Sequence, residues 1–358
     1  MMIGFILIVV DVLILIKVFD GIFFLFIWFF LFLIFLFYFF YCMKKLKKGN
    51  FDKKIKKKVN FILNDNWVSF LFVLSNNKLV TCFNDGLIKI YNKFDNIFKH
   101  ILLIKEHDKR INHCLELNLN TILTSSLDNS MKIIVLENEM NYKINQILTI
   151  HKDSVLKTIK IKNNYIISLS RDNEFIVWNF NQKDNLYYNE TRVIFQKTNS
   201  YCNILKIKEN EIIISNQNEK SLKFYDLINY KMKFIFENIK VTWTISNMCL
   251  INNNLLCIGG NDSGGFYLIN IFNYDINQII CELKWIYCIY LCKDNSIIFG
   301  GRNNILIDNI FRFFYNGKKF IIIEKKKCAH DDTILTICEL NNGIIVSGGI
   351  DRKINFWK

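Results

Sequence analysis

The chain has 358 residues and a formal net charge of +14, and its length suffices for one large hydrophobic core or two smaller ones. The charge is concentrated, because residues 44–58 hold nine Lys and one Asp whereas residues 59–358 carry only +7, so nucleic acid is disfavoured as a partner. The 11 Cys are not grouped as metal ligands are, so the sequence indicates no metal site and no cofactor, and it favours buried thiols in a reducing compartment.

Residues 1–42 are predicted to form a hydrophobic membrane segment. Residues 21–42 are 22 residues without a charge, enough to cross a bilayer as one helix. Residues 2–19 are a weaker second span because Asp11 falls near their middle, so one helix and a helical hairpin both fit. The segment lacks the basic start and the small-residue cleavage site of a signal peptide. The alternative is that these residues are translated non-coding DNA of an AT-rich genome.

Residues 43–58 are predicted to be a Lys-rich juxtamembrane linker. Positive charge beside an apolar span is retained in the cytosol, so the rest of the chain would face the cytosol. The same Lys residues would either contact anionic lipid or remain a solvated, flexible linker. Together, residues 1–58 are expected to contact the membrane.

One pattern recurs from about residue 64 to the end. Its clearest copies, residues 168–178 (SLSRDNEFIVW) and 347–357 (SGGIDRKINFW), place an Asp four residues after a Ser and a Trp ten after it. Weaker copies are Thr81-Asp85-Tyr91, Thr124-Asp128-Ile134 and Ser215-Glu219-Tyr225, with Asp262 and Asn303 at two further turns. Successive turns lie 41 to 48 residues apart. This period, with four short strands per copy, resembles the WD40 family.

The resemblance implies an all-β fold, a seven-bladed β-propeller over residues 59–358. Strands are expected at 68–74, 79–83, 87–91 and 98–104 in the first blade. In the third blade, the polar residues 181–190 are expected to be an exposed loop before a strand at 191–195. The last copy ends in its third strand, so the resemblance implies that residues 59–63 supply the fourth strand and close the ring.

His, Ser and Asp together also suggest a hydrolase. However, the sets recur from blade to blade, as a structural device does, and no strand–GxSxG–helix context is present. The resemblance implies instead two buried hydrogen-bonded networks, formed by His151, Ser168, Asp172 and Trp178 and by His330, Ser347, Asp351 and Trp357. A partial set is His107, Thr124 and Asp128. The chain is therefore predicted not to be an enzyme.

Partners of the family usually bind the face that carries these turns. Two positions per blade are expected to point there, one before the first strand and one before the turn Asp. The aromatic and Arg residues at these positions match the types enriched in interface hot spots. They are Trp67, Arg110, Arg171, Tyr201, Trp285 and Arg302. Proteins or peptides with acidic or phosphorylated groups are the favoured partners. The alternative is that the aromatic residues pack between blades and the Arg residues are merely solvated.

Two functions fit these predictions. The first is a non-enzymatic scaffold or adaptor, anchored in a membrane with its propeller on the cytosolic side. The second is a soluble WD40 subunit of a cytoplasmic or nuclear complex, in ubiquitin ligation, RNA processing or trafficking, of which residues 1–42 are not a true part. WD40 folds serve many roles, so the fold alone does not choose between them.

Overall fold

The computed structural model describes residues 58–94, 97–162, 164–194, 201–216, 221–237, 245–260, 265–280, 283–302, 308–317 and 320–357. The predicted membrane segment and residues 43–57 of the predicted linker lie outside the described residues. Within the described ranges, no helix has the length and apolar character that crossing a membrane requires.

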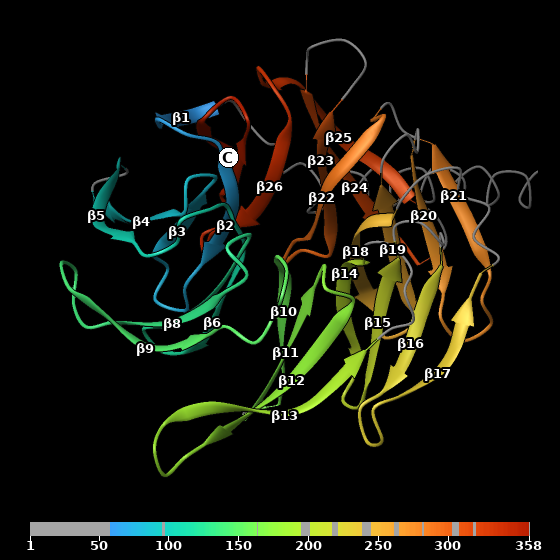
Figure 1. Cartoon of the computed structure of the whole chain (residues 1–358). Coiled ribbons are helices and arrows are strands. Elements are labelled where there is room, and N and C mark those ends of the chain that lie inside the picture. The colour runs from blue at the N-terminus through green and yellow to red at the C-terminus, as the bar shows by residue number, and fades with distance from the viewer. Residues whose placement is uncertain are drawn as a thin grey trace, which may run out of the picture. The chain divides into compact units, whose positions relative to one another are not determined.

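The described residues form seven four-stranded antiparallel sheets, the blades of a propeller (Figure 1). Blades 1 to 3 are β2 (Val68–Val73), β3 (Leu79–Phe83), β4 (Leu87–Phe94), β5 (Ile97–Lys105); β6 (Ile111–Asn118), β7 (Thr121–Ser126), β8 (Met131–Leu136), β9 (Tyr142–Leu148); and β10 (Val155–Lys162), β11 (Tyr165–Ser170), β12 (Glu174–Asn181), β13 (Leu186–Ile194). Blades 4 and 5 are β14 (Tyr201–Lys208), β15 (Glu211–Asn216), β16 (Leu222–Asp226), β17 (Lys231–Phe236); and β18 (Ile245–Asn252), β19 (Leu255–Gly260), β20 (Gly265–Asn270), β21 (Ile276–Ile280). Blades 6 and 7 are β22 (Trp285–Leu291), β23 (Ser296–Arg302), β24 (Asp308–Tyr315), β25 (Phe320–His330); and β26 (Ile334–Glu339), β27 (Ile345–Gly349), β28 (Lys353–Trp357), β1 (Lys58–Leu63).

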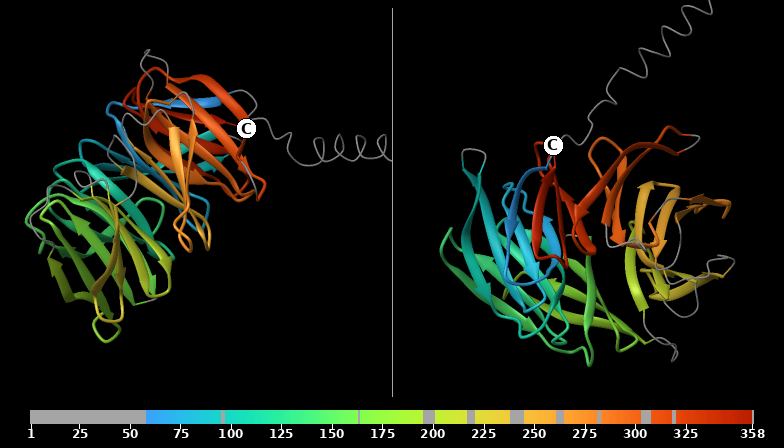
Figure 2. Two further views of the ribbon diagram at one scale, coloured as in Figure 1. Left: turned by 90° about the vertical axis from the view of Figure 1, so that its right-hand side faces the viewer. Right: turned by 90° about the horizontal axis from the view of Figure 1, so that it is seen from above.

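The first strand of each blade lines the axis of the ring. Each of these inner strands contacts the next, in the order β2, β6, β10, β14, β18, β22 and β26, and β26 contacts β2. Figure 2 shows the blades arranged around this axis from two further directions. The predicted all-β, seven-bladed fold is confirmed.

The ends of the propeller meet in blade 7. Strand β1 pairs antiparallel with β28, with Ile62 opposite Ile354 and Leu63 opposite Lys353. The backbone N–H of Asn64 extends this contact by donating to the carbonyl of Arg352 at 2.9 Å. The last blade therefore takes its fourth strand from the beginning of the described chain, and β28 has no open edge.

The hydrophobic core is divided among the spaces between neighbouring blades. Ile176 and Trp178 on one face of β12 pack with Met131 of blade 2. Phe175 on the other face packs with Tyr225 of blade 4, at a ring-centroid distance of 5.3 Å. Because each middle strand is covered on both faces, its sequence is apolar nearly throughout and does not alternate.

The loop predicted over residues 181–190 is wrong. Strand β13 already begins at Leu186, and the turn before it places Asn185 at φ 58°. Asp184 Oδ1 accepts a hydrogen bond from the Leu186 backbone N–H at 3.0 Å. β13 is the outermost strand of its blade, so exposed polar side chains such as Asn189 and Glu190 are tolerated there. Its sequence consequently lacks the apolar pattern by which a strand is recognised.

Candidate functional site

A buried histidine ties a turn of blade 3 to its strands. His151 Nδ1 lies 2.8 Å from Asp172 Oδ2, and His151 Nε2 lies 2.7 Å from Ser168 Oγ. Trp178 Nε1 donates to the same Ser168 Oγ at 2.8 Å. Blade 7 repeats the arrangement with His330, Ser347, Asp351 and Trp357, at distances of 2.8, 2.7 and 2.8 Å. The structure thus brings together each of the two four-residue sets.

A histidine that contacts an Asp through Nδ1 and a Ser through Nε2 is also found in the catalytic triad of serine hydrolases. Here, however, the serine is not available to a substrate. With the carboxylate at Nδ1, the imidazole Nε2 accepts the proton of the Ser168 hydroxyl, while the hydroxyl oxygen accepts the N–H of Trp178. Ser168 is 0% exposed. A nucleophilic oxygen must reach a substrate carbonyl, so this geometry serves to hold the turn.

The carboxylates of these sets are held in their charged form. Burial alone would raise the pKa of Asp172, but hydrogen bonds from His151 and from the backbone N–H of Lys152 hold that pKa below its ordinary value. The pKa of Asp351 is lowered in the same way, against burial, by His330 and the backbone N–H of Asp331. Each carboxylate therefore stabilises the fold through several donors at once.

Blade 2 keeps the set without its tryptophan. His107 Nδ1 lies 2.7 Å from Asp128 Oδ2 and Nε2 lies 2.8 Å from Thr124 Oγ1, while the buried Ile134 stands at the tryptophan position. Burial opposes ionisation of Asp128, but His107 and Ser130, whose hydroxyl lies 2.6 Å from the carboxylate, lower its pKa well below the ordinary range.

Blade 1 replaces the histidine by Asn64, a residue that the sequence analysis did not single out. Asn64 precedes Thr81 by 17 residues, the same separation as His151 and Ser168. Its side-chain oxygen accepts hydrogen bonds from Tyr91 Oη at 3.1 Å and from Lys89 Nζ at 3.3 Å. The constant separation was the signal that could have identified it.

The weak copy in blade 4 is displaced by one residue from its predicted alignment. In blade 3, Trp178 lies opposite Ile166, and Ser168 follows Ile166 by two residues. In blade 4, Tyr225 lies opposite Ile212, and the residue two positions after Ile212 is Ile214. Ile214, not Ser215, therefore occupies the serine position. Ser215 lies on the opposite face of β15, where its hydroxyl donates to the carbonyl of Ile245 in blade 5 at 3.3 Å.

The turn-bearing face is the end of the ring that holds the turns between second and third strands together with the starts of the inner strands. Backbone hydrogen bonds join these two features. Arg171 N donates to Ser154 O at 3.0 Å, and Leu127 N donates to Arg110 O at 2.9 Å. The two positions per blade that were predicted to face a partner are thus neighbours in blades 2 and 3.

Arg110 and Arg171 lie close together on this face. Burial, and after it the positive charge of Arg171, lowers the pKa of Arg110. The Arg110 Nε atom is buried and has no hydrogen-bond partner among the described residues. Arg171 is exposed. Two guanidinium groups side by side, one with an unused donor, make this part of the face attractive to an anion.

Trp285 and Arg302 form a second pair. They are opposite residues of β22 and β23, and the Arg302 guanidinium carbon lies 5.8 Å from the centre of the Trp285 ring. Lys284 Nζ lies 4.7 Å from the same ring. Trp285 is half-buried and Arg302 is exposed, so the indole contacts two cations at the edge of the face.

Trp67 lies in a different environment. It is 41% exposed and borders a shallow pocket of about 530 Å³ at the junction of blades 7 and 1. Asp65, Asp331, Asp332 and the exposed Arg352 also line this pocket, and Asp331 is ion-paired with Lys353. Tyr201 is the remaining predicted residue. It lies opposite Asn216, as Val155 lies opposite Ser170 in blade 3, so Tyr201 corresponds to Val155 and not to Ser154, the position expected to face a partner. The six predicted residues therefore do not form one uniform surface.

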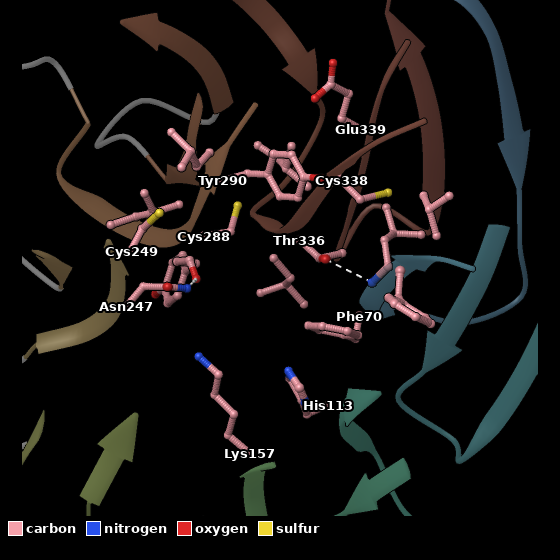
Figure 3. Close-up of a pocket in the computed structure, with 18 of the residues that line it drawn as sticks. Phe70, His113, Lys157, Asn247, Cys249, Cys288, Tyr290, Thr336, Cys338 and Glu339 are labelled. Atoms are coloured by element: carbon pink, nitrogen blue, oxygen red, sulfur yellow. Dashed lines mark hydrogen bonds between the residues drawn. The ribbon is translucent and has the colours of Figure 1, made fainter. Parts of the chain in front are cut away.

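An axial cavity of about 860 Å³ lies between the inner strands, and all seven of them contribute to its lining (Figure 3). Its polar lining residues include Asn112, His113, Lys157, Asn203 and Asn247. This cavity could not be predicted from the sequence, because its lining is assembled from seven separate strands.

No protein-family model and no curated protein matches the sequence. Among solved structures, the WD40 β-propeller domain of Doa1 is similar, with a TM-score of 0.67 and 15% identity over 84% of this chain and 96% of that chain. A chain in the crystal structure of a mitotic checkpoint complex is also similar, with a TM-score of 0.70 and 11% identity over 86% of this chain and 95% of that one. These likenesses show that the chain has the fold of a WD40 propeller.

Proposed function

We propose that the chain is a non-enzymatic scaffold whose protein partners bind the turn-bearing face. The observation that carries this proposal is the exposed Arg171 beside Arg110, whose buried Nε–H has no acceptor among the described residues. A buried donor without a partner costs free energy that a bound ligand would recover. The similarity to a chain of a multiprotein checkpoint complex supports protein partners as the ligand class.

The chemistry of the face favours a partner segment with an acidic or phosphorylated group. Such a group would accept charge-assisted hydrogen bonds from Arg110 and Arg171. Trp285 and Arg302 offer an adjoining aromatic and cationic contact. The carboxylates of Asp65 and Asp332 near Trp67, which form no ion pair among the described residues, suit a basic group of the same partner. Because the Arg pair and the carboxylates near Trp67 lie on different parts of the face, they would fix the direction in which a partner segment binds.

Replacing Arg171 or Trp285 with Ala is expected to weaken partner binding by about 2 kcal/mol or more each, roughly a 30-fold loss, because both residue types act as hot spots. Affinity purification of the tagged chain, followed by quantitative mass spectrometry, measures which partners each variant loses. The matched control is Ile228→Ala, which truncates a 73% exposed side chain in the turn between β16 and β17, at the opposite end of the blade. An unchanged partner set for both face variants would contradict the proposal.

We also propose that residues 1–42 anchor the scaffold in a membrane and that residues 43–58 keep the propeller on its cytosolic side. The support lies in the sequence, namely the uncharged residues 21–42 followed directly by the Lys-rich run. The propeller begins with β1 at Lys58, the last residue of that run, so anchor and propeller would be joined by a short basic linker.

A tag placed after Lys358 is expected to remain with membranes through carbonate washing and to be digested by added protease without detergent. Both results follow if the apolar segment spans the bilayer and the positive residues stay in the cytosol. A soluble tag on a protein that starts near Met43 would instead support the soluble-subunit alternative. A protected tag with glycan on Asn189 or Asn261 would overturn the orientation.

A further inference from the structure

The axial cavity contains an ammonium group of intermediate exposure, for which the described residues supply no counter-ion. Lys157 extends from β10 into the cavity, beside His113 of β6 (Figure 3). Its Nζ atom donates to Asn203 Oδ1 at 2.7 Å, which uses one of its three donors. Among the described residues, no carboxylate forms an ion pair with it. A cation that lines a cavity without a counter-ion attracts an anion into that cavity.

The two carboxylates that line the cavity, those of Glu116 and Glu339, lie at the end of the cavity away from Lys157. Glu116 and Glu339 lie near the ends of their inner strands, whereas Lys157 lies near the start of β10. Glu116 accepts hydrogen bonds from Ser75 N at 2.8 Å and Ser75 Oγ at 2.9 Å. Glu339 accepts one from Lys293 N at 2.8 Å. The half of the cavity nearer the turn-bearing face is therefore cationic, with Lys157 inside and Arg110 in its lining.

The other titratable groups of the cavity lining do not neutralise this charge. Burial, and after it Lys157, lowers the pKa of His113 to about 3, so the imidazole is neutral at physiological pH. Burial raises the pKa of the Cys249 thiol to about 11 and that of Tyr290 to about 12. It likewise raises those of Cys288 and Cys338. The phenol of Tyr287 and the ammonium of Lys293, whose Nζ donates to Asn341 Oδ1 at 2.8 Å, complete the titratable lining.

We propose that the axial cavity is a binding site for a phosphate-class anion, coordinated by Lys157 and reached past Arg110. Tetrahedral oxyanions accept several hydrogen bonds at once and match the two unused donors of Lys157 and the unused Nε–H of Arg110. The volume of about 860 Å³ lies within the roughly 300–1,000 Å³ of small-molecule sites. A free phosphate-bearing metabolite and a phosphorylated side chain of a partner would present the same chemistry.

Binding at this site couples to the protonation of Lys157. Burial lowers the pKa of Lys157 to about 8, and a bound anion would raise it by favouring the ammonium form. Below about pH 8 the amine is already charged, so the affinity is constant with respect to this group. Above about pH 8 each binding event must take up a proton, so the affinity falls up to tenfold per pH unit until the pKa of the complex is reached.

The test is calorimetric titration of the full-length chain, purified in a neutral detergent, with inorganic phosphate, pyrophosphate and a phosphoserine peptide beside its unphosphorylated form. Sulfate, which does not titrate in this range, serves for a pH series from about 7.5 to 9. We expect binding of at least one phosphate probe, a tenfold or greater loss in Lys157→Met, and an affinity for sulfate that weakens several-fold across the pH series. The matched control is Lys160→Met on the same strand, since Lys160 lies outside the cavity lining and donates to the Leu117 carbonyl at 2.6 Å.

Binding of phosphate or pyrophosphate points to a free metabolite, and binding of the phosphopeptide alone points to a partner side chain; either supports the site. The proposal is overturned if no phosphate probe binds, or if a folded Lys157→Met binds as tightly as the wild type. Should that variant unfold, a sulfate affinity of the wild type that does not change across the pH series overturns it equally. The two proposals share Arg110, but their tests are distinguishable, because Arg171 and Trp285, whose variants test the scaffold function, do not line the cavity, whereas Lys157 does.

Discussion

Replacing Asp172 with Ala is expected to lower the free energy of unfolding by about 3–5 kcal/mol, because three donors lose a charged acceptor at roughly 1–3 kcal/mol each. The change leaves His151 Nδ1 buried without its acceptor at 2.8 Å. The backbone N–H groups of Lys152 and Glu174 lose theirs as well, at 2.9 and 3.1 Å. Urea denaturation followed by tryptophan fluorescence measures the loss.

The matched control for this prediction is Asp108→Ala. Asp108 is exposed, directly follows the corresponding His107 of blade 2, and its carboxylate makes no hydrogen bond among the described residues. Its loss is expected to change stability by no more than about 0.5 kcal/mol. If both variants unfold at the same urea concentration, the turn network does not stabilise the blade as described.

Acidification below about pH 4 is expected to destabilise the propeller steeply. Asp128, Asp172 and Asp351 each have a folded-state pKa below the ordinary value of about 3.9. Their stabilising contribution is therefore complete above about pH 4 and is lost as the pH falls toward each folded-state pKa, because the unfolded chain then binds more protons. The loss approaches 1.4 kcal/mol per pH unit for each carboxyl, about 4 kcal/mol per unit together.

Urea midpoints between about pH 7 and pH 3 measure this dependence. Asp172→Ala is expected to show a shallower acid limb than the wild type, because one of the three titrating carboxyls is gone. Asp108→Ala should retain the wild-type slope. Parallel acid limbs for wild type and Asp172→Ala would show that other carboxyls control acid unfolding.

The fold was predictable from sequence because its repeating device demands a fixed spacing. Asp172 must reach both His151 and the backbone of its own turn, and Trp178 must reach Ser168 across two strands, so these separations recur. Where packing replaces hydrogen bonding the spacing relaxes. Blade 4 has Ile214 at the serine position, and the shift of one residue passed unnoticed beside Ser215.

The candidate site was less accessible to sequence reasoning. Residue type indicated that Arg110 and Trp67 could bind a partner, but not that one lies in cationic and the other in acidic surroundings. Two of the carboxylates around Trp67 come from Asp331 and Asp332, more than 260 residues away in the chain. Lys157 looks like any solvated lysine in the run VLKTIKIK, and only the closed ring turns it into the axial cavity.

The closing strand makes the ring sensitive to the direction of mechanical load. Lys58 at the beginning of β1 pairs with Trp357 at the end of β28, so force that pulls these two adjacent chain ends apart separates the two strands one hydrogen bond at a time. Such unzipping needs less force than shearing all the pairs together. Once β1 is released, β28 becomes an open sheet edge able to recruit another strand. Pulling these two chain ends apart would thus expose a pairing surface that the resting propeller covers.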